Sequence, residues 1–147
     1  MKFLDIYNQD KNIFKLFIND FKKTINKGDF ILGKSVKTFE KKFADYCDSK
    51  YAIGCGNGTD ALTIALKSLN LPKNSEVIMP AMTYCSTAFS IINANLKPIL
   101  VDIDYMKPTI SLNEIKKKIT SKTKVIIPVH LYGSSADTKG IKKIIGK

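Results

Sequence analysis

The residues with the clearest chemical potential form a glycine-rich loop, residues 54 to 60, which reads Gly-Cys-Gly-Asn-Gly-Thr-Asp. Glycines let the backbone approach a ligand closely, and a helix that starts here offers unpaired amides and the positive end of its dipole. The Thr59 hydroxyl could cap that helix or bond a phosphate oxygen, and Asp60 suits the first turn by its charge alone. The loop therefore predicts either a phosphate site or an ordinary tight turn between a strand and a helix.

The same loop does not match the two common nucleotide-binding motifs. It lacks the G-x-G-x-x-G spacing of dinucleotide sites, and no Gly-Lys-Ser/Thr follows it as in the P-loop. The predicted anion is therefore not the phosphate of a nucleotide bound in either of those ways.

Other polar residues carry weaker signals. His130, the only histidine, follows an apolar run and has no acidic or cysteine partner at a fixed spacing, so we do not assign it as a general base. A role near a bound cofactor stays open. Asp102 and Asp104 could form an acid pair, but aspartate is common where strands end in turns, and we favour that interpretation.

The cysteines do not indicate a metal site or disulfides. Cys47, Cys55 and Cys85 are odd in number and lack the Cys-x-x-Cys spacing of zinc sites. We expect them to be small buried apolar side chains, and we expect no metal.

The net charge of +11 is the feature most easily misread. All 24 basic residues are lysine and they are scattered along the chain, whereas nucleic-acid readers rely on arginine for bidentate contacts. We therefore expect a solvated basic surface and no nucleic-acid partner.

The longest apolar runs fall short of a membrane span, and charges occupy the start where a signal peptide would be apolar, which favours a cytoplasmic protein.

Apolar spacing predicts the elements that would position the loop. Residues 13–25 follow helical spacing and should end near Lys27 and Gly28, and residues 36–47 repeat the pattern. Beyond them, short apolar runs alternate with segments of helical length, which predicts a mostly parallel sheet covered by helices, an α/β fold. The predicted strands are 51–55, 77–79, 98–101 and 125–129.

The predicted helices of this second part differ in character. Residues 61–69 and 88–94 are apolar most of the way round and should be well buried. A surface helix should begin at Ser111, where Ser111 and Glu114 have the spacing of a capping box. Pro128 should mark the carboxyl end of the last strand, because proline cannot donate to a central ladder. A final helix is expected from residue 141.

Five segments, in one order across nearly the whole chain, resemble motifs of the DegT/StrS family of sugar aminotransferases. The loop segment GNGTDALTIAL resembles the family's [SN]GTDAL, and the segment ending in VHLYG resembles KTKAIIPVHLYG..AD. The segments lie at residues 30–33 with 39–40, 56–66, 76–87, 97–104 and 122–137.

The resemblance implies the first half of the large, cofactor-binding domain of a type I aminotransferase. On that basis residues 1–147 are an incomplete N-terminal portion of the domain, with a helical arm at 1–33 and an α/β part at 34–147. The resemblance covers well under half of a family member.

The resemblance also implies a cofactor, pyridoxal phosphate. Asn57, Gly58, Thr59 and Asp60 would hold its phosphate, and Tyr84 would lie against the pyridine ring. Without the family, Tyr84 would more simply be a core tyrosine with a bonded hydroxyl. The family's Schiff-base lysine and the aspartate that pairs with the pyridine nitrogen fall beyond this sequence, so no catalytic residue is assigned.

The implied activity is amino-group transfer from an amino acid, with glutamate expected, to a nucleotide-linked keto-sugar for cell-surface polysaccharide or amino-sugar biosynthesis. The complete family member is expected to be a homodimer. The 147 residues alone are expected to bind the cofactor weakly and to be inactive. The alternatives are a non-catalytic remnant, a partner of a complete homologue, or a generic phosphate-binding α/β module.

Overall fold

A computed structural model describes residues 5, 8, 11–28 and 30–146, without the side chains of residues 11 and 12. It divides the chain into two compact units, residues 1–54 and residues 55–147. The predicted division into an arm at 1–33 and an α/β part at 34–147 stays a prediction. None of the helices in the described part is long and apolar enough to cross a membrane.

The first unit contains α2 (Lys11–Lys27) and α3 (Lys34–Tyr46), as the apolar spacing predicts. Gly28, with φ +63°, follows the last residue of α2 in the left-handed conformation that glycine adopts readily. Large apolar side chains of α2 are exposed among the residues that the structure describes, at Ile13, Leu16, Phe17, Phe21 and Ile25.

The predicted strand at 51–55 is wrong, because these residues adopt no strand conformation. No described strand pairs with them, and the Ile53 side chain is 81% exposed. The Gly54 amide instead donates to Oε1 of Glu40 at 2.7 Å. A Cβ at position 54 would lie 3.2 Å from that same oxygen, so glycine suits this close approach.

The second unit is built on a parallel sheet of three strands in the order β2-β1-β5. The central strand β1 (Glu76–Pro80) pairs with β2 (Lys97–Val101) on one side and with β5 (Thr123–Ile126) on the other. These strands confirm three of the four predicted ones. Pro128 lies two residues past the end of β5, as its missing amide donor requires.

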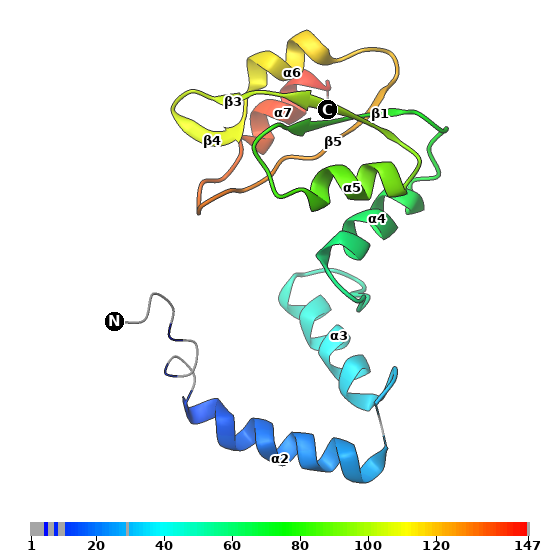
Figure 1. The fold of residues 1–147 in the computed structure, drawn as a ribbon, viewed down its shortest axis with the longest axis vertical. Helices are drawn as coiled ribbons and strands as arrows, with labels where there is room; N and C mark the ends of the chain where they lie inside the picture. Colours follow the sequence, from blue (N-terminus) through cyan, green and yellow to red (C-terminus); the bar gives the residue numbers. More distant parts are fainter. Residues whose placement is uncertain (1–4, 6–7, 9–10, 29, 147) are drawn as a thin grey trace. The chain divides into compact units, whose positions relative to one another are not determined.

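Alternate residues of β1 point into two separate apolar clusters. Ile78 belongs to one cluster, which α6 (Leu112–Lys118) and α7 (Thr138–Ile144) cover. Val77 and Met79 belong to the other, beneath α4 (Gly58–Ser68) and α5 (Ser86–Asn93). Figure 1 shows the two helix pairs on opposite sides of the strands. The predicted α/β fold, a parallel sheet covered by helices, is confirmed.

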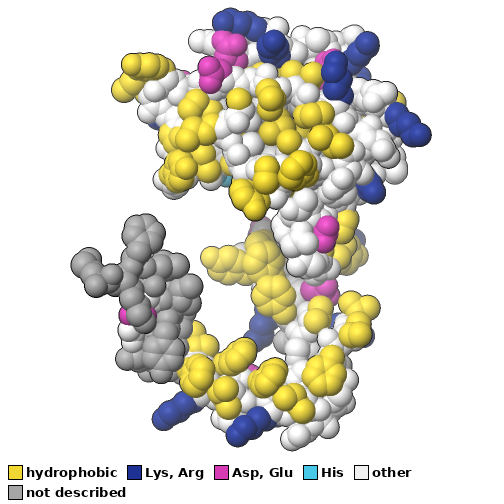
Figure 2. Space-filling model, in the orientation of Figure 1, with side chains coloured by type: hydrophobic (Ala, Val, Ile, Leu, Met, Phe, Trp, Pro, Cys, Tyr) yellow, Lys and Arg dark blue, Asp and Glu magenta, His cyan; other side chains and the backbone are white. Residues whose placement is uncertain are grey.

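The expectation that α4 and α5 are well buried is wrong. Each helix buries one face only: Leu66 in α4 and Thr87, Ser90 and Ile91 in α5. Their other apolar side chains remain accessible, and Figure 2 shows hydrophobic atoms exposed on this unit. The large apolar side chains exposed on these two helices are Ile64, Phe89 and Ile92.

A short antiparallel hairpin, β3 (Ile103–Asp104) with β4 (Lys107–Ile110), follows β2 and was not predicted. Oδ1 of Asp104 accepts the Met106 amide proton at 2.9 Å, and Oδ1 of Asp102 accepts the Ile103 amide proton at 2.8 Å. The two aspartates therefore order turns, as expected, and the structure gives no support to an acid pair.

The predicted capping box of α6 forms only in part. Ser111 Oγ accepts the Glu114 amide proton at 3.4 Å, which is the first half of the motif. The Ser111 amide donates to the Asp102 carbonyl at 3.1 Å, so the Glu114 carboxylate has no capping donor and pairs with Lys117 instead.

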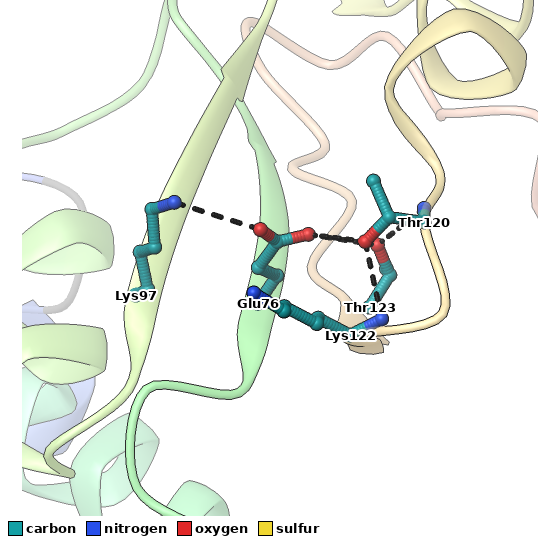
Figure 3. A network of polar contacts seen from close by, with 5 residues as sticks. All are labelled: Glu76, Lys97, Thr120, Lys122 and Thr123. Atoms are coloured by element: carbon teal, nitrogen blue, oxygen red, sulfur yellow. Dashed lines mark hydrogen bonds and ion pairs between the residues drawn. The ribbon is translucent and has the colours of Figure 1, made fainter.

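Glu76 joins the three parallel strands where they begin (Figure 3). Its nearly buried carboxylate accepts the Thr120 hydroxyl proton at 2.6 Å and lies 3.5 Å from Lys97 Nζ of β2. The Thr120 hydrogen bond is the largest of the effects that lower the Glu76 pKa, and the charges of Lys97 and Lys122 act in the same direction.

This network predicts an acid-sensitive contribution to stability. A carboxyl whose pKa is lower in the folded chain stabilises the fold above its ordinary pKa of 4.5, and this contribution disappears as the pH falls through the folded value. We expect Glu76→Gln to remove that part of the pH dependence, measured by urea unfolding at pH 7 and in steps below pH 4.5. Thr120→Val should weaken the same pH dependence, because the folded pKa of Glu76 returns toward its ordinary value when this hydrogen bond is lost. An unchanged profile in both variants would contradict the assignment.

Candidate phosphate site

The first turn of α4 is closed by a reciprocal pair of hydrogen bonds between Asn57 and Asp60. Asn57, in extended conformation, is the N-cap: its Oδ1 accepts the Asp60 amide proton at 2.9 Å. Its Nδ2 donates to Asp60 Oδ2, also at 2.9 Å. These bonds occupy the Asp60 amide and one carboxylate oxygen, so the structure places both residues in the helix cap.

The amides next to this cap remain available to a ligand. Among the residues that the structure describes, no acceptor bonds the backbone amides of Gly58 and Thr59. A Cβ added at Gly58 would meet no atom within 4 Å, whereas one at Gly56 would lie 3.1 Å from Asp60 Oδ2. The space beside Gly58 is therefore open, and two donors at the positive end of a helix are unpaired there. Below, we use the term phosphate site for this candidate site, which consists of these two amides and the Thr59 hydroxyl.

A second helix begins beside the phosphate site. The Thr59 hydroxyl donates to Ser86 Oγ at 2.8 Å, and Ser86 is the first residue of α5. The loop that leads into α5 starts at the carboxyl end of β1, which is where α/β proteins bind ligands. Our sequence analysis did not single out Ser86. The available signal was a hydroxyl residue two positions after Tyr84, at the start of a predicted helix.

Tyr84 lies in the loop between β1 and α5, and its side chain is 75% exposed. The alternative of a core tyrosine is therefore wrong. The Tyr84 carbonyl accepts the Thr87 amide proton at 3.0 Å, and the hydroxyls of Thr83 and Thr87 lie 3.0 Å apart, which orders the backbone on both sides of the ring. The ring itself is accessible for stacking against a flat ligand.

His130 has a structural contact instead of a catalytic partner. Its Nδ1 accepts the Ala136 amide proton at 3.0 Å, so the hydrogen of the neutral ring resides on Nε2. Between these residues the chain reverses through Tyr132 and Gly133, both at positive φ. The structure does not bring His130 to the phosphate site through any described contact.

The cysteines are not buried, which corrects the sequence-based expectation. Cys47 follows the last turn of α3, Cys55 lies in the glycine-rich loop and Cys85 precedes α5, and all three are exposed. Their positions at helix ends and loops explain the difference, because burial at such sites depends on neighbouring segments. Within the described ranges, no group of three or more potential metal ligands comes together.

Fold and candidate site together describe an α/β protein in which a helix start with unpaired donors lies beside the element that follows the central strand of a parallel sheet. A model of the DegT/DnrJ/EryC1/StrS aminotransferase family matches residues 11–147, and the chain belongs to this family. It is 39% identical over 145 residues to dTDP-3-amino-3,6-dideoxy-alpha-D-galactopyranose transaminase of Aneurinibacillus thermoaerophilus, matching 99% of this chain and 40% of that protein. It is 37% identical to UDP-2-acetamido-2-deoxy-3-oxo-D-glucuronate aminotransferase of Pseudomonas aeruginosa, over 100% of this chain and 41% of that protein.

Solved structures agree with the family assignment. S. venezuelae DesV in complex with a ketimine intermediate superposes with a TM-score of 0.90 at 30% identity, over 97% of this chain and 38% of DesV. Bacillus subtilis NtdA with bound cofactor PMP (pyridoxamine phosphate) superposes with a TM-score of 0.83 at 36% identity, over 86% of this chain and 29% of NtdA. The chain thus spans about two fifths of the length of the curated relatives named above.

Proposed function

We propose that this chain forms the phosphate-binding and ring-stacking part of a pyridoxal-phosphate site in a sugar aminotransferase. The observation that carries the proposal is the open start of α4, where two unpaired amides and the Thr59 hydroxyl lie beside the first residue of α5. Structural similarity to an enzyme with bound pyridoxamine phosphate supports it.

Each residue has a defined task in this proposal. The amides of Gly58 and Thr59 and the Thr59 hydroxyl bind the phosphate, which the positive end of the α4 dipole also favours. Asn57 and Asp60 keep that turn in place through their mutual hydrogen bonds. The Tyr84 ring stacks on the pyridine ring and excludes water from one of its faces. When bound, the cofactor supplies an electron sink for amino-group transfer.

The proposed substrates follow from the relatives. The names of two relatives identify nucleotide-linked sugars, one a dTDP-sugar and the other a UDP-sugar. A third, 35% identical, is a 3-oxo-glucose-6-phosphate:glutamate aminotransferase of Bacillus subtilis, which supports glutamate as amino donor. We therefore propose a nucleotide-linked keto-sugar as acceptor, a place in cell-surface polysaccharide or amino-sugar biosynthesis, and a cytoplasmic location.

A homodimer is the proposed assembly of the whole protein. The apolar side chains exposed along α2, such as Leu16 and Phe17, support it, because an exposed apolar surface of this kind marks a site of contact with protein. The same surface also suits the alternative in which this chain pairs with a complete homologue. Sedimentation analysis of the chain alone and with a homologue separates the two.

We assign none of the 24 lysines to the Schiff base, since none lies in the segment that would carry it in the family. The proposal is therefore that these 147 residues bind the cofactor weakly and do not catalyse transamination by themselves. Transaminase activity of the purified chain, with glutamate and a nucleotide-linked keto-sugar, would contradict this part.

Thr59→Val is expected to weaken the binding of pyridoxamine phosphate about tenfold, because a hydrogen bond to a charged phosphate oxygen is lost. Pyridoxamine phosphate suits the test because it needs no lysine to bind. Two-dimensional amide NMR, in which the ligand is titrated into the millimolar range, measures even weak binding at Gly58 and Thr59.

Two controls sharpen this test. Thr63→Val removes a hydroxyl from the same helix, but that hydroxyl donates to the Thr59 carbonyl at 2.9 Å, so binding should change little. Pyridoxamine, which has no phosphate, should bind wild type and Thr59→Val equally weakly. If wild type does not distinguish the two ligands, the proposed phosphate site is wrong.

A further inference from the structure

The contact between Thr59 and Ser86 adds a residue to the proposed phosphate site, and this inference rests on the proposed function. The two oxygens are 2.8 Å apart and partly buried, and the bond joins helices that start 28 residues apart in the chain. Thr59 is the donor, so Ser86 Oγ is the acceptor and its own hydroxyl hydrogen is not used in this bond.

The start of α5 also has unpaired hydrogen-bond donors. Its N-cap residue, Cys85, makes no side-chain capping bond, unlike Asn57 at the start of α4. The Ser86 amide likewise has no acceptor among the described residues. The hydrogen bond between Thr59 and Ser86 therefore joins two helix starts that both have unpaired donors. Of these two helices, only α4 has a side-chain cap.

We propose that Ser86 is a positioning residue for the phosphate of the cofactor and acts through Thr59. A phosphate oxygen only accepts hydrogen bonds, so the Thr59 hydroxyl hydrogen must turn from Ser86 to the phosphate when the ligand binds. Ser86 then donates its own hydrogen to Thr59 Oγ. The hydroxyls form a chain in which each bond polarises the next and strengthens the final bond to phosphate. No covalent bond forms or breaks.

Ser86→Ala should weaken the binding of pyridoxamine phosphate by about threefold to tenfold, since one link of this chain is lost. Ser86→Thr, which keeps a hydroxyl, should bind like wild type. Ser68→Ala is the matched control, because Ser68 Oγ donates to the Ala65 carbonyl at the opposite end of α4. Dissociation constants come from amide NMR titrations with pyridoxamine phosphate and with pyridoxamine, and melting temperatures are recorded for every variant.

The double variant Thr59→Val, Ser86→Ala tests whether Ser86 acts through Thr59 or contacts the ligand independently. If Ser86 acts through Thr59, adding Ser86→Ala to Thr59→Val should change the affinity by less than about twofold. Additive losses would overturn the inference, because Ser86 would then contact the ligand independently. Equal loss for the phosphorylated and unphosphorylated ligands would also overturn it, and so would undiminished binding in Ser86→Ala. A wild-type chain without phosphate preference would overturn the proposed function as well.

Discussion

Replacing Ile78 by alanine is expected to lower the free energy of unfolding of the second unit by about 2 to 5 kcal/mol, the range for truncating a buried isoleucine. The Ile78 side chain is 0% exposed in the central strand and packs in the cluster shared with Ile115 and Ile141. Both flanking strands hydrogen-bond to β1, so little room exists for the backbone to close the cavity.

Urea unfolding followed by circular dichroism measures this loss. Domains are typically stable by only about 5 to 15 kcal/mol, so the variant should unfold at much lower urea concentrations or fail to fold. Ile92→Ala is the matched control: it deletes the same atoms from α5 at a side chain that is 54% exposed. If both substitutions cost the same, the described cluster is not the core.

Gly140→Ala is expected to destabilise the fold by about 1 to 3 kcal/mol, as overpacking does. In most helices this substitution stabilises, by up to about 1 kcal/mol. The sign reverses here because a Cβ at residue 140 would lie 2.5 Å from Asp137 Oδ2 and collide with Leu112 Cδ1. Asp137 caps α7, with Oδ1 accepting the Gly140 amide proton at 2.8 Å, so relieving the collision disturbs the cap.

Gly58→Ala provides the comparison of opposite sign. A Cβ at Gly58 would meet no atom within 4 Å, so alanine there should be neutral or slightly stabilising in thermal unfolding. A Gly140→Ala chain that melts at or above the wild-type temperature would show that the space between α6 and α7 is larger than the structure indicates.

Local signals predicted the parts of the fold that depend on neighbours in the sequence. Strands β1, β2 and β5 appear where short apolar runs occur, and the Ser111 cap forms three residues before Glu114. The Asn57 cap also involves residues only three apart, although the sequence led us to consider Thr59 as the possible cap. Such features require no knowledge of the tertiary fold, because turn chemistry and side-chain periodicity act within a few residues.

Contacts between distant residues explain what the sequence could not predict. The Thr59 to Ser86 bond spans 27 residues and the Glu76 to Thr120 bond spans 44, and neither has a sequence motif of its own. Burial follows the same logic: Ile64 and Phe89 have helical spacing that suits a core, yet only the arrangement of the layers decides which face is covered. For the candidate site, the loop and Tyr84 were identified from sequence, whereas Ser86 required the structure.

The order of strands in the sheet has a consequence for how the second unit folds. The central strand β1 pairs with β2, whose register begins 21 residues later at Lys97, and with β5, whose register begins 47 residues later at Thr123. Pairing of such distant segments is slow, because the entropy of closing the loops is lost before the contacts form. During synthesis β1 therefore emerges from the ribosome well before its second partner, and its apolar residues Val77 to Met79 lack the neighbouring strand β5 in that interval.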